Sequence, residues 1–463
     1  MYLYFFYVGI GAFQKHFMII LRHFVYLYII LVKQIIVMQK EEYKIHIIGA
    51  GISGLIAAQV LENQGYHPIL LEKSDRVGGR VASDHIDGYV LDHGFQVLLT
   101  AYPKAQQYLD YNALQLQQFL PGTVIFDKGS TQKIGDPLRS ASLLWPTIVS
   151  SAAFFSDKLK IFKLTNALKA KSIAQIFEEE EQTTLQYLQD YGFSSTVINQ
   201  FFIPFFSGIF LETALNTSSR MFQFVYKMFS EGYAAIPKAG IQAIPDQLAA
   251  HLQHTTIQYN TAVKRVEEGK ITLADDTILE SHFTIIATAP SSLIQNLNNQ
   301  ETVWKSCDTL YFETKEPVIS QALIGLVTES KSLINNICYP TNFEADRTTT
   351  GHLLSVTVVK AHDYDEETLV AIVEKELQEY CGIQTKRFIK RYRIPNALPD
   401  LKNVQYSMSP TETNILPRVY LAGDHMLNGS LNGAMLSGEM AARGVIEALE
   451  NGLVVGELTS EYR

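Results

Sequence analysis

The feature that most constrains the fold is a glycine-rich turn that joins a short apolar run to a helical segment. Residues 44–48 (KIHII) have the pattern of a buried parallel strand, and GAGISG at residues 49–54 follows directly. A helix is expected from there to about Asn63, and a second strand at residues 68–71 leads to Glu72. This order predicts a dinucleotide-binding α/β domain, in which a strand, a G-x-G-x-x-G turn, a helix, a second strand and an acidic residue follow one another. An incidental glycine turn would leave the order unexplained.

Each glycine of the turn has a separate task in this kind of site. Gly49 permits the tight turn, Gly51 lets the backbone approach a pyrophosphate, and Gly54 lets the helix pack closely on the strand. The first helical turn, which contains Ser53, offers free N–H groups and a partial positive charge to the phosphates. Glu72 is placed to accept hydrogen bonds from a ribose diol, and its charge would repel a 2′-phosphate, which disfavours NADP.

Residues 72–80 carry a second glycine signal, E-x-x-x-R-x-G-G-R. Gly78 and Gly79 expose backbone N–H groups, and Arg80 has the planar guanidinium that pairs with phosphate. The stretch resembles the second motif of FAD-dependent amine oxidases, protoporphyrinogen oxidases and carotenoid (phytoene) desaturases. In that superfamily the two glycines and the second arginine lie along the FAD phosphates. A glycine hairpin with solvated arginines is the alternative.

Residues 91–97 (LDHGFQV) match the next segment of that flavoprotein superfamily. The resemblance places Gly94 close to the isoalloxazine ring, so His93 and Gln96 would approach the flavin. An ordinary loop histidine and glutamine, satisfied by local hydrogen bonds, are the alternative for each residue. They are the only candidates for a catalytic role, and no general base is identified.

The C-terminal part contains the partner motif, VYLAGD at residues 419–424, followed by NGAMLSG. An apolar strand ends at Gly423, and Asp424 is expected to accept hydrogen bonds from ribityl hydroxyls or from neighbouring backbone. Asn432 is expected to cap a helix that runs to about Leu449. In relatives this helix points its N-terminus at the pyrimidine edge of the flavin, where its dipole stabilises negative charge.

The pairing of these distant motifs implies an α/β fold in which an FAD/NAD(P)-binding Rossmann-like domain, of the glutathione-reductase type, carries an inserted α+β substrate domain. The FAD-binding domain is assigned to residues 38–105, 237–292 and 405–463. The substrate domain is assigned to residues 106–236, which are helical and aromatic-rich, and 293–404. By the same resemblance, the strand that contains Val263 would lie near the adenine.

The resemblance implies FAD as the cofactor. Binding would be noncovalent, because no cysteine lies near residues 423–437, where some amine oxidases attach the ring. The residues expected to bind it are Gly49, Gly51, Ser53, Gly54, Glu72, Lys73, Gly78, Gly79, Arg80, Gly94, Val263, Gly423, Asp424, Gly433 and Ala434.

Charge and cysteine content exclude other classes. The chain has 463 residues and a formal net charge of −9, whereas a nucleic-acid binder normally has a basic excess. Cys307, Cys338 and Cys381 are far apart and have no metal-binding spacing. Neither a disulfide framework nor a metal site is therefore expected, and a reducing compartment, the cytoplasm, fits best.

Residues 1–37 form a separate hydrophobic extension with no acidic residue. Its most apolar run, residues 17–32, is interrupted by Arg22 and His23. A membrane-spanning helix needs about 20 mostly apolar residues. Two interpretations are open: an N-terminal anchor that associates the protein with a membrane, or a stretch upstream of a true translation start at Met38.

Aromatic residues are dense in the expected substrate domain. They would either line a tunnel for an apolar ligand or form an ordinary core. They are Phe201, Phe202, Phe205, Phe206, Phe210, Phe222, Phe224, Tyr226 and Phe229.

The leading hypothesis is an FAD-dependent oxidoreductase that transfers hydride from an apolar, isoprenoid-like small molecule to flavin N5, with oxygen or a quinone as the electron acceptor. The first alternative is an amine oxidase that produces hydrogen peroxide. Ser430 and Leu431 weaken it, because they stand where such enzymes often carry a cage tyrosine. A structural flavin or a non-redox flavin isomerase is the second alternative.

Overall fold

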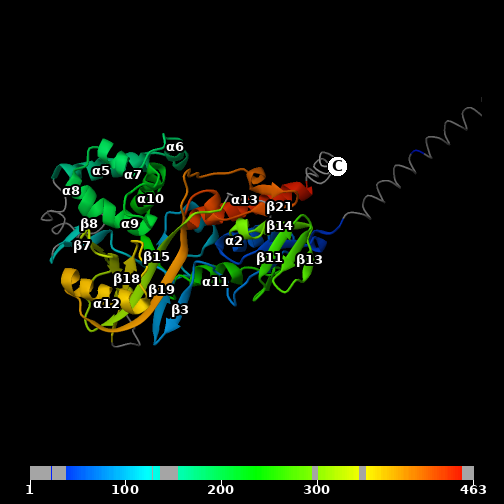
Figure 1. Ribbon diagram of the computed structural model, residues 1–463. Helices are drawn as coiled ribbons and strands as arrows, with labels where there is room; N and C mark the ends of the chain where they lie inside the picture. Colours follow the sequence, from blue (N-terminus) through cyan, green and yellow to red (C-terminus); the bar gives the residue numbers. More distant parts are fainter. Residues whose placement is uncertain are drawn as a thin grey trace, which may run out of the picture.

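The computed structural model describes residues 38–127, 129–135, 155–294, 301–343 and 351–450, together with Arg22. Residues 38–450 of this set form two lobes that lie side by side (Figure 1). Apart from Arg22, the N-terminal extension lies outside the described residues, so both interpretations of it stay predictions.

The first lobe is built on a six-stranded sheet in the order β10-β2-β1-β14-β21-β20, parallel except for the edge pair β20 and β21. Its strands are β1 (Ile45–Ile48), β2 (Ile69–Leu71), β10 (Thr256–Gln258), β14 (Phe283–Ile286), β20 (Asn414–Leu416) and β21 (Val419–Leu421). β1 lies in the middle, and all four of its residues are buried. A central parallel strand is covered on both faces, which explains its apolar sequence.

Helices cover one face of this sheet and a small antiparallel meander covers the other. Successive residues of β1 alternate between the two: Ile47 packs into the core shared with the helices, and Ile48 packs into the core shared with the meander. The helices are α2 (Ile52–Glu62), α3 (Pro103–Tyr108), α11 (Ala243–Ala250) and α13 (Leu431–Glu450). The meander consists of β11 (Val263–Glu267), β12 (Lys270–Leu273) and β13 (Ile278–Glu280).

The two long helices of this lobe approach each other unusually closely. A Cβ on Gly438 of α13 would lie 2.2 Å from the carbonyl oxygen of Ser53 in the first turn of α2. Only glycine allows this approach, since any side chain at residue 438 would collide with backbone. The contact brings the C-terminal motif beside the first glycine turn.

The second lobe contains a seven-stranded sheet in the order β19-β15-β18-β17-β16-β7-β8. Its pairs are antiparallel except β16 and β7. The strands are β7 (Gly122–Asp127), β8 (Ser130–Gly135), β15 (Trp304–Thr314), β16 (Ile324–Val327), β17 (Ile334–Cys338), β18 (His352–Val358) and β19 (Thr385–Pro399). Helix α12 (Glu366–Glu376) packs on this sheet through Leu369 and Val373, which are fully buried.

A layer of helices completes the second lobe above the sheet (Figure 1). These helices are α5 (Phe155–Ala170), α6 (Ile173–Phe177), α7 (Thr184–Asp190), α8 (Ser195–Val197), α9 (Ile203–Phe210) and α10 (Ser219–Glu231). The aromatic residues singled out in the sequence lie in α9, in α10 and in the π-helical turn η3 (Ile198–Phe202) that precedes α9.

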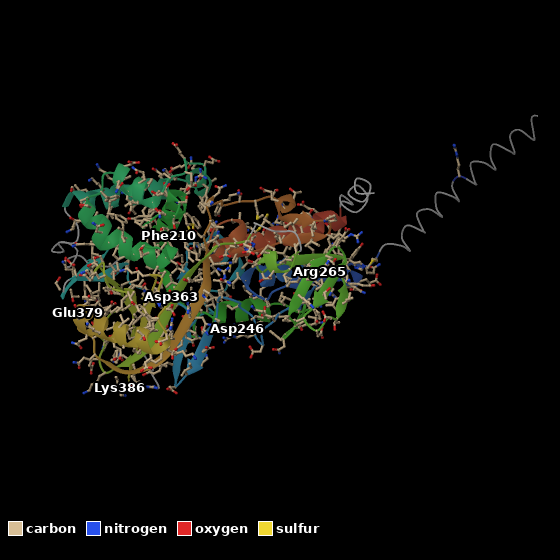
Figure 2. The ribbon with its side chains drawn as sticks, viewed as in Figure 1. Phe210, Asp246, Arg265, Asp363, Glu379 and Lys386 are labelled. Atoms are coloured by element: carbon tan, nitrogen blue, oxygen red, sulfur yellow. The ribbon has the colours of Figure 1, made fainter. Side chains whose placement is uncertain are left out.

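Five of those aromatic residues are core residues, with exposed fractions of 0–1%. They are Phe202, Phe206, Phe210, Phe222 and Phe224. Figure 2 labels Phe210 within this helical layer. The tunnel interpretation is therefore wrong for these five, because their rings pack on one another, as Phe206 and Phe222 do with centroids 4.7 Å apart. Phe201, Phe205, Tyr226 and Phe229 are partly buried against the same core.

Short elements connect the two lobes. A hairpin of β3 (Ser83–Ile86) and β4 (Tyr89–Asp92) follows the second glycine motif. A three-stranded sheet joins β5 (Leu98–Leu99), β9 (Ala234–Ile236) and β6 (Gln117–Gln118). The 3₁₀ and π-helical turns are η1 (Lys40–Glu42), η3 (Ile198–Phe202), η4 (Pro290–Ser292), η5 (Pro340–Asn342), η6 (Leu377–Cys381), η7 (Pro410–Thr413) and η8 (Asp424–Met426).

The predicted fold class, a Rossmann-like domain with an α+β insertion, is confirmed by this architecture. The central parallel sheet takes its strands from three separate stretches of the chain, and the second sheet takes its strands from two. The exact domain limits at residues 105, 236, 292 and 404 stay predictions. Among the described residues, no helix has both the length and the apolar character needed to cross a membrane.

We expect Gly438→Ala to lower the free energy of unfolding by about 1–3 kcal/mol, because the added methyl group forces α13 away from α2. Urea unfolding followed by circular dichroism measures this change. Glu447→Ala, at an exposed position of the same helix, is the matched control and should stay within about 0.5 kcal/mol of wild type. Equal stability of all three proteins would contradict the close helix contact.

Candidate cofactor-binding site

The first glycine turn has the geometry that a dinucleotide site requires. Gly49 has a φ of +99°, in the left-handed region that favours glycine, and its amide donates to the Leu71 carbonyl at 2.8 Å. A Cβ on Gly54 would lie 2.0 Å from the Gly49 oxygen. By contrast, a Cβ on Gly51 would meet nothing closer than the Gly78 oxygen at 4.0 Å. Two glycines are thus required by packing, whereas Gly51 borders open space.

The first turn of α2 borders the same space. The amides of residues 52–54 precede the first intrahelical hydrogen bond, which Leu55 donates to Gly51, so they have no intrahelical acceptor. Ser53 itself is 5% exposed, and its carbonyl lies against Gly438. Any contact that Ser53 makes with a phosphate would therefore come from its backbone.

Glu72 is buried and stabilises the turn. Its Oε2 accepts from the Ala50 amide at 2.7 Å, and its Oε1 accepts from the amide and hydroxyl of Ser74 at 2.9 and 2.7 Å. The predicted hydrogen bonds from a ribose diol to Glu72 stay a prediction. They would need lone pairs of the Glu72 carboxylate that these three hydrogen bonds do not use. Lys73 is exposed beside it.

The second glycine motif lies directly on the first. The Gly78 amide donates to the Ala50 carbonyl at 2.8 Å, and Gly51 and Gly78 form a parallel bridge. Gly78 and Gly79 both have positive φ, +117° and +61°. Gln242 supports the loop from α11's side by donating to the Val77 carbonyl at 3.0 Å. Two loops that the sequence marked separately therefore lie directly against each other.

Arg80 and Asp424 form a bidentate ion pair across the site. The Arg80 guanidinium donates to the two carboxylate oxygens of Asp424 at 2.5 and 3.0 Å, and it lies over the ring of Trp304. These residues were expected at different parts of the cofactor, Arg80 at the phosphates and Asp424 at the ribityl chain. The structure brings them together, although 344 positions separate them.

The two weak catalytic candidates both make local hydrogen bonds. His93 Nε2 lies 2.8 Å from Asp84 Oδ2, and its ring packs against Tyr392 with centroids 4.3 Å apart. The Gln96 amide donates to the carbonyls of Arg80 and His93 at 2.8 and 2.9 Å. These bonds favour the loop-supporting alternative for both residues.

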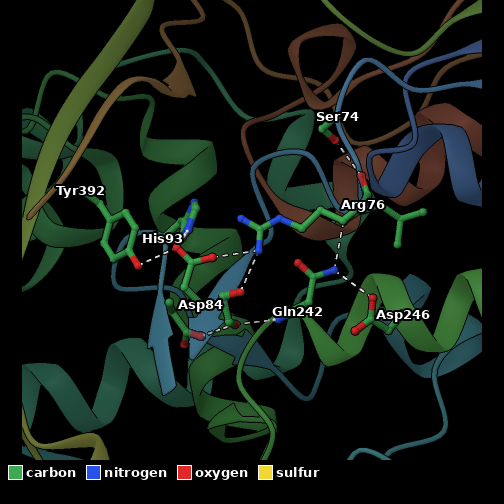
Figure 3. Close-up of polar contacts among 10 residues, drawn as sticks. Ser74, Arg76, Asp84, His93, Gln242, Asp246 and Tyr392 are labelled. Carbon is green, nitrogen blue, oxygen red and sulfur yellow. Dashed lines mark hydrogen bonds and ion pairs between the residues drawn. The ribbon is translucent and has the colours of Figure 1, made fainter. Parts of the chain in front are cut away.

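Asp84 is the centre of the polar network drawn in Figure 3. It accepts from His93, from the Tyr392 hydroxyl at 2.8 Å and from Arg76 at 2.9 Å. Burial by itself would raise the Asp84 pKa, but these hydrogen bonds outweigh it and lower the pKa from 3.8 to about 2. Because Tyr392 belongs to β19, the network ties the second glycine motif to the other lobe.

Gly94 and Gly423 both occupy positions that a side chain would disturb. Gly94 has a φ of +92°, and a Cβ there would lie 2.9 Å from Ile394. Gly423 has a φ of +151°, and a Cβ there would collide with the ring of His425. The Gly423 amide donates to the Ser437 hydroxyl at 2.9 Å, which holds the end of β21 against α13.

The expectation that Asn432 caps α13 is wrong. The helix begins at Leu431, and Ser430 is its cap, because its hydroxyl accepts from the Gly433 amide at 2.9 Å. Asn432 instead accepts from the Lys104 amide at 3.0 Å, and its Nδ2 is buried with no partner among the described residues.

Gly433 and Ala434 occupy the first turn of α13. A Cβ on Gly433 would lie 2.5 Å from the Asn428 carbonyl, so glycine is required there. Ala434 is partly exposed. The helix presents its positive N-terminal end at this point.

Val263 opens β11 beside the acidic end of β2. The neighbouring Thr261 amide donates to the Glu72 carbonyl at 2.8 Å, and the Asn260 amide donates to the Ser74 carbonyl at 2.9 Å. The predicted adenine-side strand is therefore adjacent to the residue predicted to bind ribose.

These groups fit a bound dinucleotide. The open side of Gly51 and the amides of α2's first turn form a cradle of backbone donors, and the Gly78 loop lies against it. The orphaned buried Nδ2 of Asn432 supplies another donor at the α13 end. Tyr392, Gln242 and Trp304 were not predicted as site residues, since no motif in the sequence marks them. Ser430 was noted only for the tyrosine that it replaces, and its capping role was not predicted.

Comparison with known proteins agrees with this geometry. A family model described as flavin containing amine oxidoreductase matches residues 52–446. L-amino-acid oxidase of Bungarus fasciatus is 25% identical over 240 residues, which cover 48% of this chain and 46% of the relative. The chain thus spans less than half the length of the first curated relatives that it matches.

Two further matches extend along most of the chain. The 15-cis-phytoene desaturase of Narcissus pseudonarcissus is 20% identical over 467 residues, covering 87% of this chain and 79% of the relative. The crystal structure of a CLA-producing fatty acid isomerase from P. acnes has a TM-score of 0.64 at 16% identity, covering 87% of this chain and 98% of that chain. The second match shows a shared fold.

We expect Gly51→Ala to weaken FAD binding at least about tenfold while leaving the apoprotein as stable as wild type. The added methyl group has room in the fold but occupies the approach to the pyrophosphate, where each charge-assisted hydrogen bond contributes about 1.5–3 kcal/mol. Flavin fluorescence titration measures the affinity, and urea unfolding of the apoprotein is the control. Wild-type affinity in the variant would place the phosphates elsewhere.

We expect wild type to have a higher free energy of unfolding than Asp84→Asn. This difference should be constant above about pH 4 and should disappear as the pH falls toward 2. The Asp84 pKa is lower in the folded state than in the unfolded state, so the unfolded chain takes up the proton first and folding loses free energy. Urea unfolding across this pH range measures the difference. Asp363→Asn, at an exposed carboxylate, should follow the wild-type curve.

Proposed function

Because the chain belongs to the flavin-containing amine oxidoreductase family, whose members are FAD-dependent oxidoreductases, we propose that it oxidises an apolar, isoprenoid-like small molecule. FAD, when bound, supplies the acceptor for the hydride that leaves a substrate C–H bond. The residues of this chain hold the cofactor, orient the substrate and exclude water.

The capping role of Ser430 is the observation that carries this proposal. An amine oxidase needs aromatic side chains over the flavin, and this position is where a cage tyrosine often stands. Here the Ser430 hydroxyl accepts from the Gly433 amide and donates to Asn428 Oδ1 at 2.5 Å. A small polar residue that caps the helix leaves no aromatic wall at that point.

Aromatic residues follow Gly94, which the resemblance places near the flavin ring. Phe95 follows Gly94 and packs on Phe119 at 6.1 Å between ring centroids, and Phe119 packs on Phe343 at 4.7 Å. Tyr406 packs on Phe177 with ring centroids 5.7 Å apart. Such surroundings suit a substrate that presents no charge.

The charged groups next to this region support the same substrate class. Arg80 and Asp424 neutralise each other, and Lys305 lies 3.4 Å from Asp400 and donates to the Thr217 hydroxyl. A cationic amine would need an uncompensated carboxylate or an aromatic cage. Phytoene desaturase, a relative that matches most of the chain, acts on phytoene, as its name states.

Amine oxidation is the second candidate, favoured by the match to an L-amino-acid oxidase. It predicts release of hydrogen peroxide in air. A desaturase-like enzyme would transfer its electrons to oxygen or to a quinone, so the acceptor is tested together with the substrate.

We expect an acyclic polyene hydrocarbon in detergent micelles to bleach the oxidised flavin absorbance without oxygen, and amines and amino acids to leave it unchanged. Anaerobic stopped-flow spectroscopy of the full FAD-loaded chain measures this. Heat-denatured protein with added free FAD is the control. Rapid bleaching by an amine, with equimolar peroxide on admission of air, would replace the proposal by the amine oxidase alternative.

A further inference from the structure

A cavity of about 490 Å³ lies in the second lobe, where α9 packs on β16 and β17 from the helical layer above the sheet (Figure 1). Ile203, Pro204 and Ser207 of α9 line one side of it. The turn that joins β16 to β17 lines the other side, together with Val359 and Lys360 after β18. Small-molecule sites in proteins have volumes of roughly 300–1,000 Å³, so this α9 cavity has the size of a ligand site.

The α9 cavity is separate from the surroundings proposed for the oxidised substrate. It lies at the Ile334 end of β17. From the other end of β17, at Cys338, the chain continues to Phe343, which packs on Phe119. A strand rises about 3.3 Å per residue, so the two ends of β17 are about 13 Å apart. A molecule in the α9 cavity would therefore not compete with the substrate.

One hydroxyl group of the cavity wall is buried without a partner. Ser207 is 1% exposed, and its Oγ makes no hydrogen bond among the described residues. A serine inside a helix can donate to a carbonyl of the preceding turn, but Ser207 does not. Because burying a hydroxyl without a hydrogen bond costs free energy, Ser207 is suited to a partner that does not belong to the chain.

Other groups of the wall also keep unused hydrogen-bonding capacity. Asn335 Nδ2 donates to the Pro204 carbonyl at 3.1 Å, which holds the side chain in place and leaves its Oδ1 as an acceptor. Lys360 Nζ donates to the carbonyls of Ser330 and Ser332. An ammonium group has three protons, so one N–H of Lys360 remains. The wall therefore offers both donors and acceptors.

The charges on the wall are balanced. Lys360 and Glu329 are the charged residues among the described residues that line the cavity. An anion would be repelled by Glu329 and a cation by Lys360, so neither sign of charge is favoured. The remaining polar lining consists of hydroxyl and amide groups, such as those of Thr213 and Asn199, which form hydrogen bonds without a charge.

We propose that the α9 cavity binds a small neutral molecule with several hydroxyl groups, of the size of a monosaccharide or a cyclic polyol. Its hydroxyl groups, each of which donates and accepts, pair with Ser207, Asn335 and Lys360. Its C–H face packs on the aliphatic side chains of Ile203 and Leu333, which also line the cavity. The bound molecule joins α9 to the turn between β16 and β17. This binding does not depend on the proposed oxidation or on its substrate.

Saturation-transfer difference NMR of the full FAD-loaded chain tests the proposal, with myo-inositol and D-glucose as the probes. We expect saturable binding of at least one probe and no change in the flavin absorbance, because the cavity is separate from the cofactor region. L-Serine, a zwitterion, and acetate, an anion, are titrated under the same conditions and should bind more weakly.

Two variants locate the binding. Ser207→Ala should weaken it about fivefold or more, because it removes the unpaired hydroxyl, and its thermal stability should not fall, because no hydrogen bond within the chain is lost. Thr213→Trp, at an exposed position of the cavity wall, should abolish binding by filling the cavity. Ser195→Ala and Thr277→Trp are matched controls at exposed positions outside the cavity, and both should bind the probes as wild type does.

Three outcomes would overturn the proposal. One is saturable binding of neither probe, or tighter binding of L-serine or acetate than of both probes. Another is undiminished binding of the probes by Thr213→Trp. The third is a change in flavin absorbance on adding a probe, which would place the binding at the cofactor instead.

Discussion

The rest of the structure depends on close backbone contacts among three chain segments: the first glycine turn, the loop at Gly78 and helix α13. The turn at residues 49–54 receives a hydrogen bond from Gly78 on one side and the glycine face of α13 on the other, at Gly438. The approach of α13 at Gly438 is closer than any side chain would permit. Because these segments come from both ends of the chain, the lobe forms only when the ends meet, and the intervening residues fold as an insertion.

One ion pair and one hydrogen bond connect the segments that this stacking brings together. Arg80 and Asp424 join the second glycine motif to the end of β21, and Asp84 joins the following hairpin to Tyr392 in the other lobe. Asp424 is buried, whereas Arg80 and Asp84 are partly open to solvent. The cofactor region is thereby held against the sheet of the second lobe from two sides.

The apolar surroundings proposed for the substrate belong to the connection between the lobes. Phe95 follows Gly94 in the chain, and its ring packs on that of Phe119 with centroids 6.1 Å apart.

The amino-acid sequence alone determined the local elements of the first lobe. Within a few residues, it predicted the bounds of β1, the glycine turn, α2, β2 and the final helix. The reason is that hydrophobic spacing and glycine positions act over a short range of sequence. The assignment of the Asn432 side chain failed, since Ser430 and Asn432 are both good caps and only the path of the preceding loop selects one. Tertiary structure decided three further features. Arg80 forms an ion pair with Asp424, and Glu72 accepts a hydrogen bond from the Ala50 amide. Some of the phenylalanines are core residues, whereas others are only partly buried. Those outcomes depend on which distant segments arrive at the same place, and no local pattern encodes that.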